Sequence, residues 1–182
     1  MSRISIPTID NSAEASKPLL AAVHKQLGVV PNLMKLVGHS PAALEGYLSL
    51  NGALGKGKLN VQLRERIALA IAEYNACDYC LSAHDYLGQA VAKLSRAELD
   101  AARDAHSEDS KTQAALQFAL RVAQSRGRVS DADIARIRLA GFDDASVIEI
   151  VANVAVNVLT NYINNVAQTD IDFPVVNAKL AA

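Results

Sequence analysis

The stretch EYNACDYCLSAH, residues 73–84, holds both cysteines of this 182-residue chain and one of its four histidines. It separates a strong helical pattern from the next one, because a break at Asn75 or Ala76 would let a new helix begin near Cys77. If residues 77–84 are helical, Cys80 and His84 lie one turn apart on the same face. A thiol beside a base can form thiolate near neutral pH. We therefore expect this stretch to determine both the local fold and the function.

Outward from this stretch, every long segment has the apolar spacing of a helix, and we find no convincing alternating strand. The sequence thus predicts an all-α fold. Asn60 is a plausible N-cap, Ser95 and Ser130 begin capping-box patterns, and Gly127 and Gly141 are expected helix stops. The helices are expected at about residues 13–28, 32–38, 41–55, 61–74, 77–92, a short one from 95, 111–126, 131–140 and 144–167.

The length suits a single domain, residues 1–182. Within it we expect a core motif region at about 30–95 and a second helical lobe at about 109–174, joined by a polar loop near 107–110. The tail Asp170-Ile171-Asp172-Phe173-Pro174 is expected to dock against the rest of the chain as a strap.

The composition narrows the class of protein. Hydrophobic residues make up 51% and aromatic residues 4%, with no Trp, so the core must be aliphatic. The net charge is −1, and no Lys/Arg cluster indicates a nucleic-acid partner. The first residues lack the apolar stretch of a signal peptide, and no run approaches the ~18 apolar residues of a membrane span. Two cysteines are too few for a disulfide scaffold, so a cytoplasmic location is expected.

The last expected helix, 144–167, is apolar nearly all round and must be buried, either centrally or against another subunit. We therefore expect a homo-oligomer. Asparagines recur through this helix at helical spacing, and we interpret them as a polar strip bonded across an interface rather than as catalytic groups: Asn153, Asn157, Asn161, Asn164 and Asn165.

Three interpretations compete for Cys77, Cys80 and His84: a structural zinc site, two unreactive cysteines, and a redox site. A structural zinc site needs four ligands, and this cluster supplies three at most. A covalent haem would need Cys-x-x-Cys-His, but residue 81 is Leu. Two buried, unreactive cysteines would explain the composition but not the spacing to His84. A redox site uses every member of the cluster.

Helical geometry assigns roles within the redox interpretation. Cys77 lies about 10 Å from His84 along a helix, whereas Cys80 is one turn away, so Cys80 is the thiol that His84 can deprotonate. Cys80 would attack, and Cys77 would close a disulfide with it. The carboxylate that completes a proton relay is left open by these arguments. Glu73 is near in sequence, whereas Glu65 can take part only if the chain breaks near Asn75 and folds back.

The spacing Glu65-x11-Cys77-x2-Cys80-x3-His84 resembles that of the alkyl hydroperoxidase D group, within the carboxymuconolactone decarboxylase-like superfamily. Softer similarity to its peroxidase-related branch extends over most of residues 30–174, through Val30-Pro31-Asn32-Leu33, His39-Ser40-Pro41, Leu63-Arg64-Glu65, Asn161-Tyr162 and Asp172-Phe173-Pro174. The resemblance implies an all-helical alkyl hydroperoxidase D-like fold, with the CxxC motif at a helix N-terminus, that forms trimers or hexamers. It also implies a peroxidase without a cofactor, in which Cys80 is peroxidatic, Cys77 resolves it, and Glu65 and His84 relay protons.

One departure from the family pattern concerns Tyr79, which occupies the position of a second His. A phenol can donate a hydrogen bond to a thiolate or peroxide but is a poor base near pH 7. We expect Tyr79 to take part in the site by orienting a partner. The function expected is a thiol-dependent peroxidase that reduces hydrogen or alkyl hydroperoxides, with an external dithiol as reductant. The alternatives are a dithiol–disulfide oxidoreductase or redox sensor, and a non-enzymatic helical assembly protein.

Overall fold

The structure, a computed structural model, describes residues 2–179, and within that range it contains helices and connecting loops but no strand. The all-α class is therefore confirmed. The elements, in order, are the 3-10 helix η1 (Glu14–Ser16), α1 (Lys17–Leu27), α2 (Asn32–Val37), α3 (Pro41–Leu54), α4 (Val61–Tyr74), α5 (Asp78–Ala90), α6 (Arg96–Arg103), α7 (Ser110–Ser125), α8 (Asp131–Leu139) and α9 (Asp144–Ala167).

The helix ends follow the capping residues. The Asn60 side chain accepts from the Leu63 N–H at the start of α4, and Ser95 and Ser130 each form a full capping box. Gly127 and Gly141 adopt positive φ just after α7 and α8, where a side chain would be strained. These predicted caps and stops are confirmed, and most predicted helix bounds agree with the structure to within two residues. The first helix is the exception, because its first turn is the separate 3-10 helix η1.

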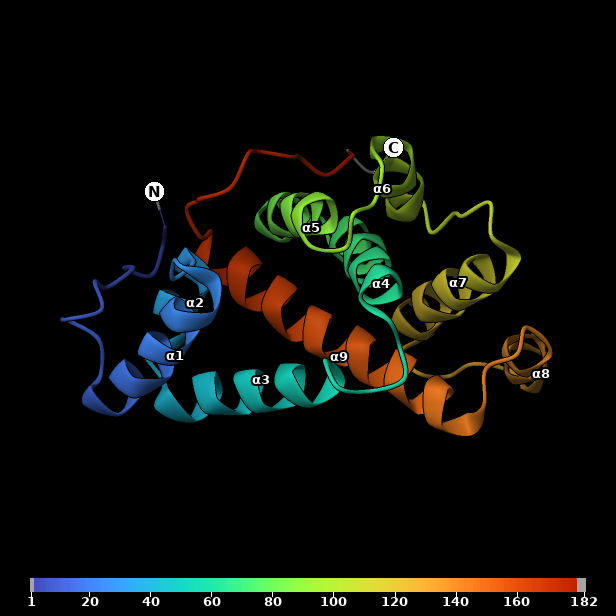
Figure 1. Cartoon of the computed structure of the whole chain (residues 1–182), viewed down its shortest axis with the longest axis horizontal. Helices are drawn as coiled ribbons and strands as arrows, with labels where there is room; N and C mark the ends of the chain where they lie inside the picture. The colour runs from blue at the N-terminus through green and yellow to red at the C-terminus, as the bar shows by residue number, and fades with distance from the viewer. Residues whose placement is uncertain (1, 180–182) are drawn as a thin grey trace.

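Helices α4 and α9 lie at the centre, and the others pack around them. Figure 1 shows α9 crossing the middle of the molecule, with α3 along one side and α4 and α5 on the other. Helix α4 contacts α5, α6, α7 and α9, and its stretch from Ile67 to Ala72 is buried throughout. The α4 side chains divide between two apolar clusters: Leu69 and Ala72 belong to the one around α5, and Ile67 and Ile71 to the one around α7. The two expected lobes therefore share their central helices.

Helix α9 is long and apolar enough, by length and composition alone, to cross a membrane, and 44% of its apolar window is buried inside the chain. A core helix of a soluble protein passes the same test. Its asparagines correct the sequence interpretation: Asn153, Asn157, Asn161 and Asn164 are buried within their own chain. The asparagine amides bond groups inside the fold, as described below. The exposed face of α9 is apolar instead. Its exposed large side chains are Ile148, Val151, Leu159, Tyr162 and Val166.

After α9, residues 170–179 form an extended segment, here called the C-terminal strap, that returns over α5 toward α6 (Figure 1). The Val176 N–H donates to Ser82 Oγ at 2.9 Å, and the Ala178 N–H donates to Asp78 Oδ1 at 2.7 Å. At its far end, Arg103 donates to the Asn177 carbonyl at 2.8 Å. The strap therefore covers the first turns of the helix that carries the two cysteines.

Candidate active site

The chain breaks between α4 and α5 at Asn75 and Ala76, as the sequence suggested. Ala76 has a φ of 49°, a left-handed conformation that costs an alanine about 1–2 kcal/mol. Two amides of α9 hold the break in place: the Asn75 side chain donates to Asn161 Oδ1 at 2.9 Å, and Asn165 donates to the Asn75 carbonyl at 2.8 Å. The strained turn is thus compensated by hydrogen bonds, and α5 can pack back along α4.

Cys77 is the N-cap of α5, and its sulfur accepts from the Cys80 N–H at 3.3 Å. A disulfide joins Cys77 to Cys80, with 5.3 Å between their Cα atoms. Both residues are buried: Cys77 is 0% and Cys80 3% exposed. An N-terminal helix position stabilises negative charge on sulfur, because the first N–H groups have no partner within the helix. The pair is therefore placed for thiolate chemistry after reduction.

His84 lies one turn beyond Cys80, and its Nδ1 is 2.8 Å from Glu65 Oε2. The contact joins α5 to α4 across 19 residues of sequence. Nε2 of the ring has no hydrogen-bond partner among residues 2–179. In the tautomer that donates Nδ1–H to the carboxylate, Nε2 is an acceptor. The structure thus brings together Glu65, His84 and the two cysteines, as the spacing suggested.

Glu73, the other carboxylate considered, points away from this site. Its Oε2 accepts from Arg103 Nε at 2.6 Å, and its Oε1 accepts from the Lys179 N–H at 2.6 Å. Both oxygens hold the C-terminal strap and α6 to the end of α4. Glu73 therefore has a structural position, and Glu65 is the carboxylate within reach of His84.

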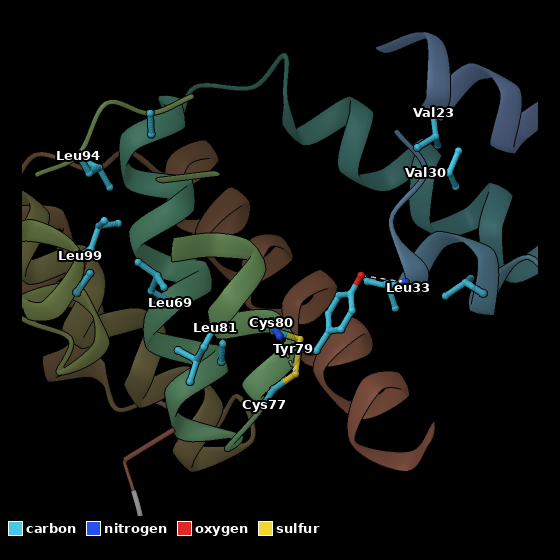
Figure 2. Packing of buried hydrophobic residues seen from close by; sticks show 14 of the residues in the cluster. Val23, Val30, Leu33, Leu69, Cys77, Tyr79, Cys80, Leu81, Leu94 and Leu99 are labelled. Carbon is cyan, nitrogen blue, oxygen red and sulfur yellow. Dashed lines mark hydrogen bonds between the residues drawn. A yellow bond between two sulfur atoms is a disulfide. The ribbon is translucent and has the colours of Figure 1, made fainter. Parts of the chain in front are cut away.

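Tyr79 differs from the sequence expectation. Its hydroxyl accepts from the Leu33 N–H at 3.0 Å (Figure 2) and donates to Asp172 Oδ1 at 2.8 Å, so its only donor is used. Its ring packs edge-on against Phe173 at 5.8 Å. Burial, with the nearby Asp172 charge, raises the pKa of Tyr79 far above its usual value. The hydroxyl does not orient a peroxide or thiolate here; it fastens α2 and the C-terminal strap to α5.

A cavity of about 190 Å³ opens beside Cys80 and His84. Its other walls are largely apolar and come from α1, α2, α3, α5 and the strap. They include Val23, Leu27, Met34, Leu48, Leu87 and Phe173. Among the cavities described, this one reaches Cys80, whereas Cys77 lines none of them. Cys80 is therefore the sulfur that a small molecule can approach.

A second, polar cavity of about 130 Å³ lies on the other side of the histidine. It is lined by Glu65, Arg64 and the amides of Asn153 and Asn157, and His84 borders both cavities. Tyr47 also borders both, and burial together with the Glu65 charge raises its pKa to about 12. The Glu65–His84 pair therefore stands between an apolar chamber at the sulfur and a polar one suited to water and protons.

Sequence reasoning missed Asn164 as a site residue. Asn164 lies on α9, and its side-chain Nδ2 donates to Cys80 Sγ at 3.3 Å. The signal was present, because the asparagines of α9 follow a helical period. The period alone did not show which way that face points.

The three other histidines of the sequence lie elsewhere. Residues His24, His39 and His106 do not join the cysteine cluster, and among residues 2–179 no group of three or more His, Cys, Asp and Glu side chains is arranged to hold a metal ion.

Comparisons with known proteins agree with this geometry. Residues 41–125 match the model of the Carboxymuconolactone decarboxylase family. A crystal structure described as an alkylhydroperoxidase AhpD core, an uncharacterized peroxidase-related protein from Ralstonia eutropha JMP134, is 26% identical with a TM-score of 0.82. The match covers 94% of this chain and 92% of that one. No curated protein sequence matches the chain.

Two more distant structures share the fold. A peroxidase-related protein from Silicibacter sp. TM1040 is 23% identical over 93% of this chain and 91% of its own, with a TM-score of 0.79. The debrominase Bmp8, as a cysteine-to-alanine variant in complex with 2,3,4-tribromopyrrole, is 21% identical over 93% and 91%, with a TM-score of 0.76. Fold and motif agree with the match over residues 41–125: the chain has an alkyl hydroperoxidase D-like fold, and its similarities lie within the carboxymuconolactone decarboxylase-like superfamily.

Proposed function

We propose that this protein is a thiol-dependent peroxidase that needs no cofactor and in which Cys80 is the attacking residue. The observation that carries the proposal is the placement of Cys80 and His84 on one wall of a cavity, with Glu65 bonded to the histidine behind them. The disulfide to Cys77 shows that the second thiol is within bonding reach of the first. A nucleophile, a base and a group that orients the base are the parts that covalent catalysis requires.

The proposed reaction begins with reduced Cys77 and Cys80. His84 Nε2 takes the Cys80 proton, and the thiolate attacks the terminal oxygen of a hydroperoxide, ROOH. An S–O bond forms, the O–O bond breaks, and the departing RO⁻ takes the proton back from His84 to leave as ROH. Cys80 is then a sulfenic acid. The Cys77 thiol condenses with it to give the disulfide and water, and an external dithiol reduces the disulfide while becoming a disulfide itself.

The walls of the chamber favour an organic hydroperoxide over hydrogen peroxide. Leu27, Met34, Leu48 and Phe173 would contact the R group and gain apolar burial that hydrogen peroxide cannot provide. The reductant would be a dithiol supplied by a reducing compartment such as the cytoplasm. Reduction must begin at Cys80, or after the C-terminal strap moves, because Cys77 is fully buried.

We also propose that the protein assembles as a homo-oligomer, a trimer or hexamer, through the exposed face of α9. Ile148, Leu159, Tyr162 and Val166 are 44–67% exposed along one helix. Such a row of apolar side chains is typical of a surface that a partner covers. Sedimentation of the wild type and of an Ile148→Ser, Val166→Ser double variant tests this, because a monomeric wild type would contradict it.

The test of the peroxidase proposal compares two single substitutions. Reduced wild type, Cys80→Ser and Cys77→Ser are mixed with cumene hydroperoxide or hydrogen peroxide, and peroxide loss is followed with and without dithiothreitol. Cys80→Ser should fall to the rate without protein. Cys77→Ser should consume one equivalent of peroxide quickly and yield a sulfenic acid that a trapping reagent labels. Full activity in Cys80→Ser would refute the assignment of the attacking residue.

The same experiment separates the alternatives. A dithiol–disulfide oxidoreductase or sensor would show a titratable 77–80 disulfide but no fast sulfenic acid. An assembly protein would keep its thiols blocked in the native state. Because a debrominase shares the fold, bromide release from 2,3,4-tribromopyrrole is measured in parallel. Bromide release without peroxide consumption would replace the proposal with reductive dehalogenation.

A further inference from the structure

The carboxamide of Asn164, on α9, lies against the sulfur of Cys80. Nδ2 is 3.3 Å from Sγ, and Asn164 is 3% exposed. A disulfide sulfur carries no hydrogen and can only accept, so the amide must present its NH₂ group to it. This contact comes from α9, 84 residues from Cys80 in sequence and beyond the segment that matches the family model.

We propose that Asn164 is a catalytic residue that stabilises the Cys80 thiolate and then holds the sulfenic acid formed from it; the second part rests on the proposed peroxidase function. Reduction of the disulfide turns a weak acceptor into an anion. A hydrogen bond to a charged acceptor is stronger than one to a neutral acceptor, so the same N–H gains strength when the thiolate forms. Asn164 thus favours the reactive form of the nucleophile over its neutral form.

The other end of the amide supports this role. Asn164 Oδ1 is buried and has no hydrogen-bond partner among residues 2–179 in the disulfide state. A buried acceptor without a donor is costly, and such groups are rare. The sulfenic acid of Cys80 brings an O–H donor to this location, because the sulfur already touches the same carboxamide. In that state both ends of the amide have a hydrogen-bond partner. Oδ1 therefore lacks a donor in the disulfide state of the proposed cycle and gains one in the sulfenic acid state.

The amide is also held in position before reaction. Asn161 and Asn165, on either side of it along α9, bond the side chain and the carbonyl of Asn75 at the turn that begins the cysteine segment. The helix that carries Asn164 is therefore fixed to the segment that carries Cys80. A donor held this way stabilises charge without having to reorganise.

The experiment titrates the Cys80 thiol alone, in a Cys77→Ser background, by the ultraviolet absorbance of the thiolate. Asn164→Ala removes the donor, and Asn164→Asp keeps the side-chain shape while placing a carboxylate at the sulfur. Gln168→Ala is the matched control, because it removes an amide one turn further along, at the C-cap of α9, that donates to a backbone carbonyl rather than to sulfur. Thermal unfolding confirms that each variant is folded, and the Asp variant carries the test if the Ala variant does not fold.

We expect the Cys80 pKa to rise by about 1 pH unit in Asn164→Ala, and by at least as much in Asn164→Asp, relative to the background protein. Gln168→Ala should leave the titration unchanged. The rate with cumene hydroperoxide at fixed pH should fall about tenfold in Asn164→Ala and recover in part at high pH, where the thiolate forms without help.

Equal titrations in both Asn164 variants and the background would overturn the inference, as would an equal shift in Gln168→Ala. The titration does not depend on the substrate. A shifted thiol in a protein that consumes no peroxide would therefore refute the proposed function and leave the thiolate role of Asn164 standing.

Discussion

Two pairs of a ring and a carboxylate flank the cysteines, each joined by a hydrogen bond of 2.8 Å: His84 with Glu65, and Tyr79 with Asp172. Both bring distant parts of the chain to α5, the first from α4 and the second from the C-terminal strap. The two rings differ in the hydrogen-bonding atoms that remain unused. Among residues 2–179 one ring nitrogen of His84 has no partner, and His84 borders two cavities. The Tyr79 hydroxyl uses its donor on Asp172 and also accepts from the Leu33 N–H.

The difference shows that distance alone does not identify a catalytic pair. A group that transfers protons needs an open position near the reacting atom, and His84 borders the cavity that Cys80 also lines. A group whose hydrogen bonds are all satisfied by the fold stabilises that fold, and Tyr79 is such a group. We infer that one pair performs chemistry and the other closes the site.

The largest expected effect comes from breaking the first pair. His84→Gln and Glu65→Gln should each reduce the rate of peroxide consumption about 100-fold, because a positioned general base contributes at least that much. If the two residues act as one unit, the double variant should be little slower than either single variant. Stopped-flow measurement of sulfenic acid formation in the Cys77→Ser background provides the rates.

Glu73→Gln is the control for this cycle. It removes a carboxylate that is closer than Glu65 to the cysteines in sequence, but one that bonds Arg103 and the strap. Its rate should stay within about twofold of the wild type, while its stability falls. A 100-fold loss in Glu73→Gln with normal Glu65→Gln kinetics would reverse the assignment.

The helices and caps could be predicted from the sequence because they depend on neighbours within four residues. Asn60, Ser95 and Ser130 cap helices through their own side chains, and Cys77 was correctly expected at a helix start. The contact between Glu65 and His84 could not be derived from local physics. It depends on a turn in which Ala76, rather than a glycine, takes positive φ.

The partners of Tyr79 and the direction of the α9 asparagines were also beyond local reasoning. Leu33 is 46 residues and Asp172 is 93 residues from Tyr79, so only tertiary packing joins them. The asparagine period was visible in the sequence, but a polar face on an apolar helix fits an interface as well as an interior. Only the position of α9 against α5 shows that Asn164 meets Cys80.

A smaller effect is expected from opening the second pair. Tyr79→Phe keeps the ring against Phe173 but leaves the buried Leu33 N–H without its acceptor. We expect the free energy of unfolding to fall by about 1–3 kcal/mol, measured by urea denaturation. The rate of sulfenic acid formation per folded molecule should change less than about threefold. A 100-fold rate loss in a variant of normal stability would make Tyr79 part of the chemistry and remove the contrast between the pairs.

The smallest effect is the alkaline dependence of stability. Burial raises the pKa of Tyr79, so above pH 10 the unfolded chain releases this proton while the folded chain keeps it. Stability is therefore fully present below about pH 10 and is lost as the pH rises above it, by about 1.4 kcal/mol from this residue at pH 11. Urea unfolding at pH 8 and pH 11 should show that the stability difference between wild type and Tyr79→Phe shrinks by about that amount. Tyr74→Phe, which alters a tyrosine that is 48% exposed and lies outside the proposed oligomer face, is the control and should match the wild-type pH dependence. An unchanged difference between wild type and Tyr79→Phe would mean that the hydroxyl is less tightly enclosed than its bonds to Leu33 and Asp172 require.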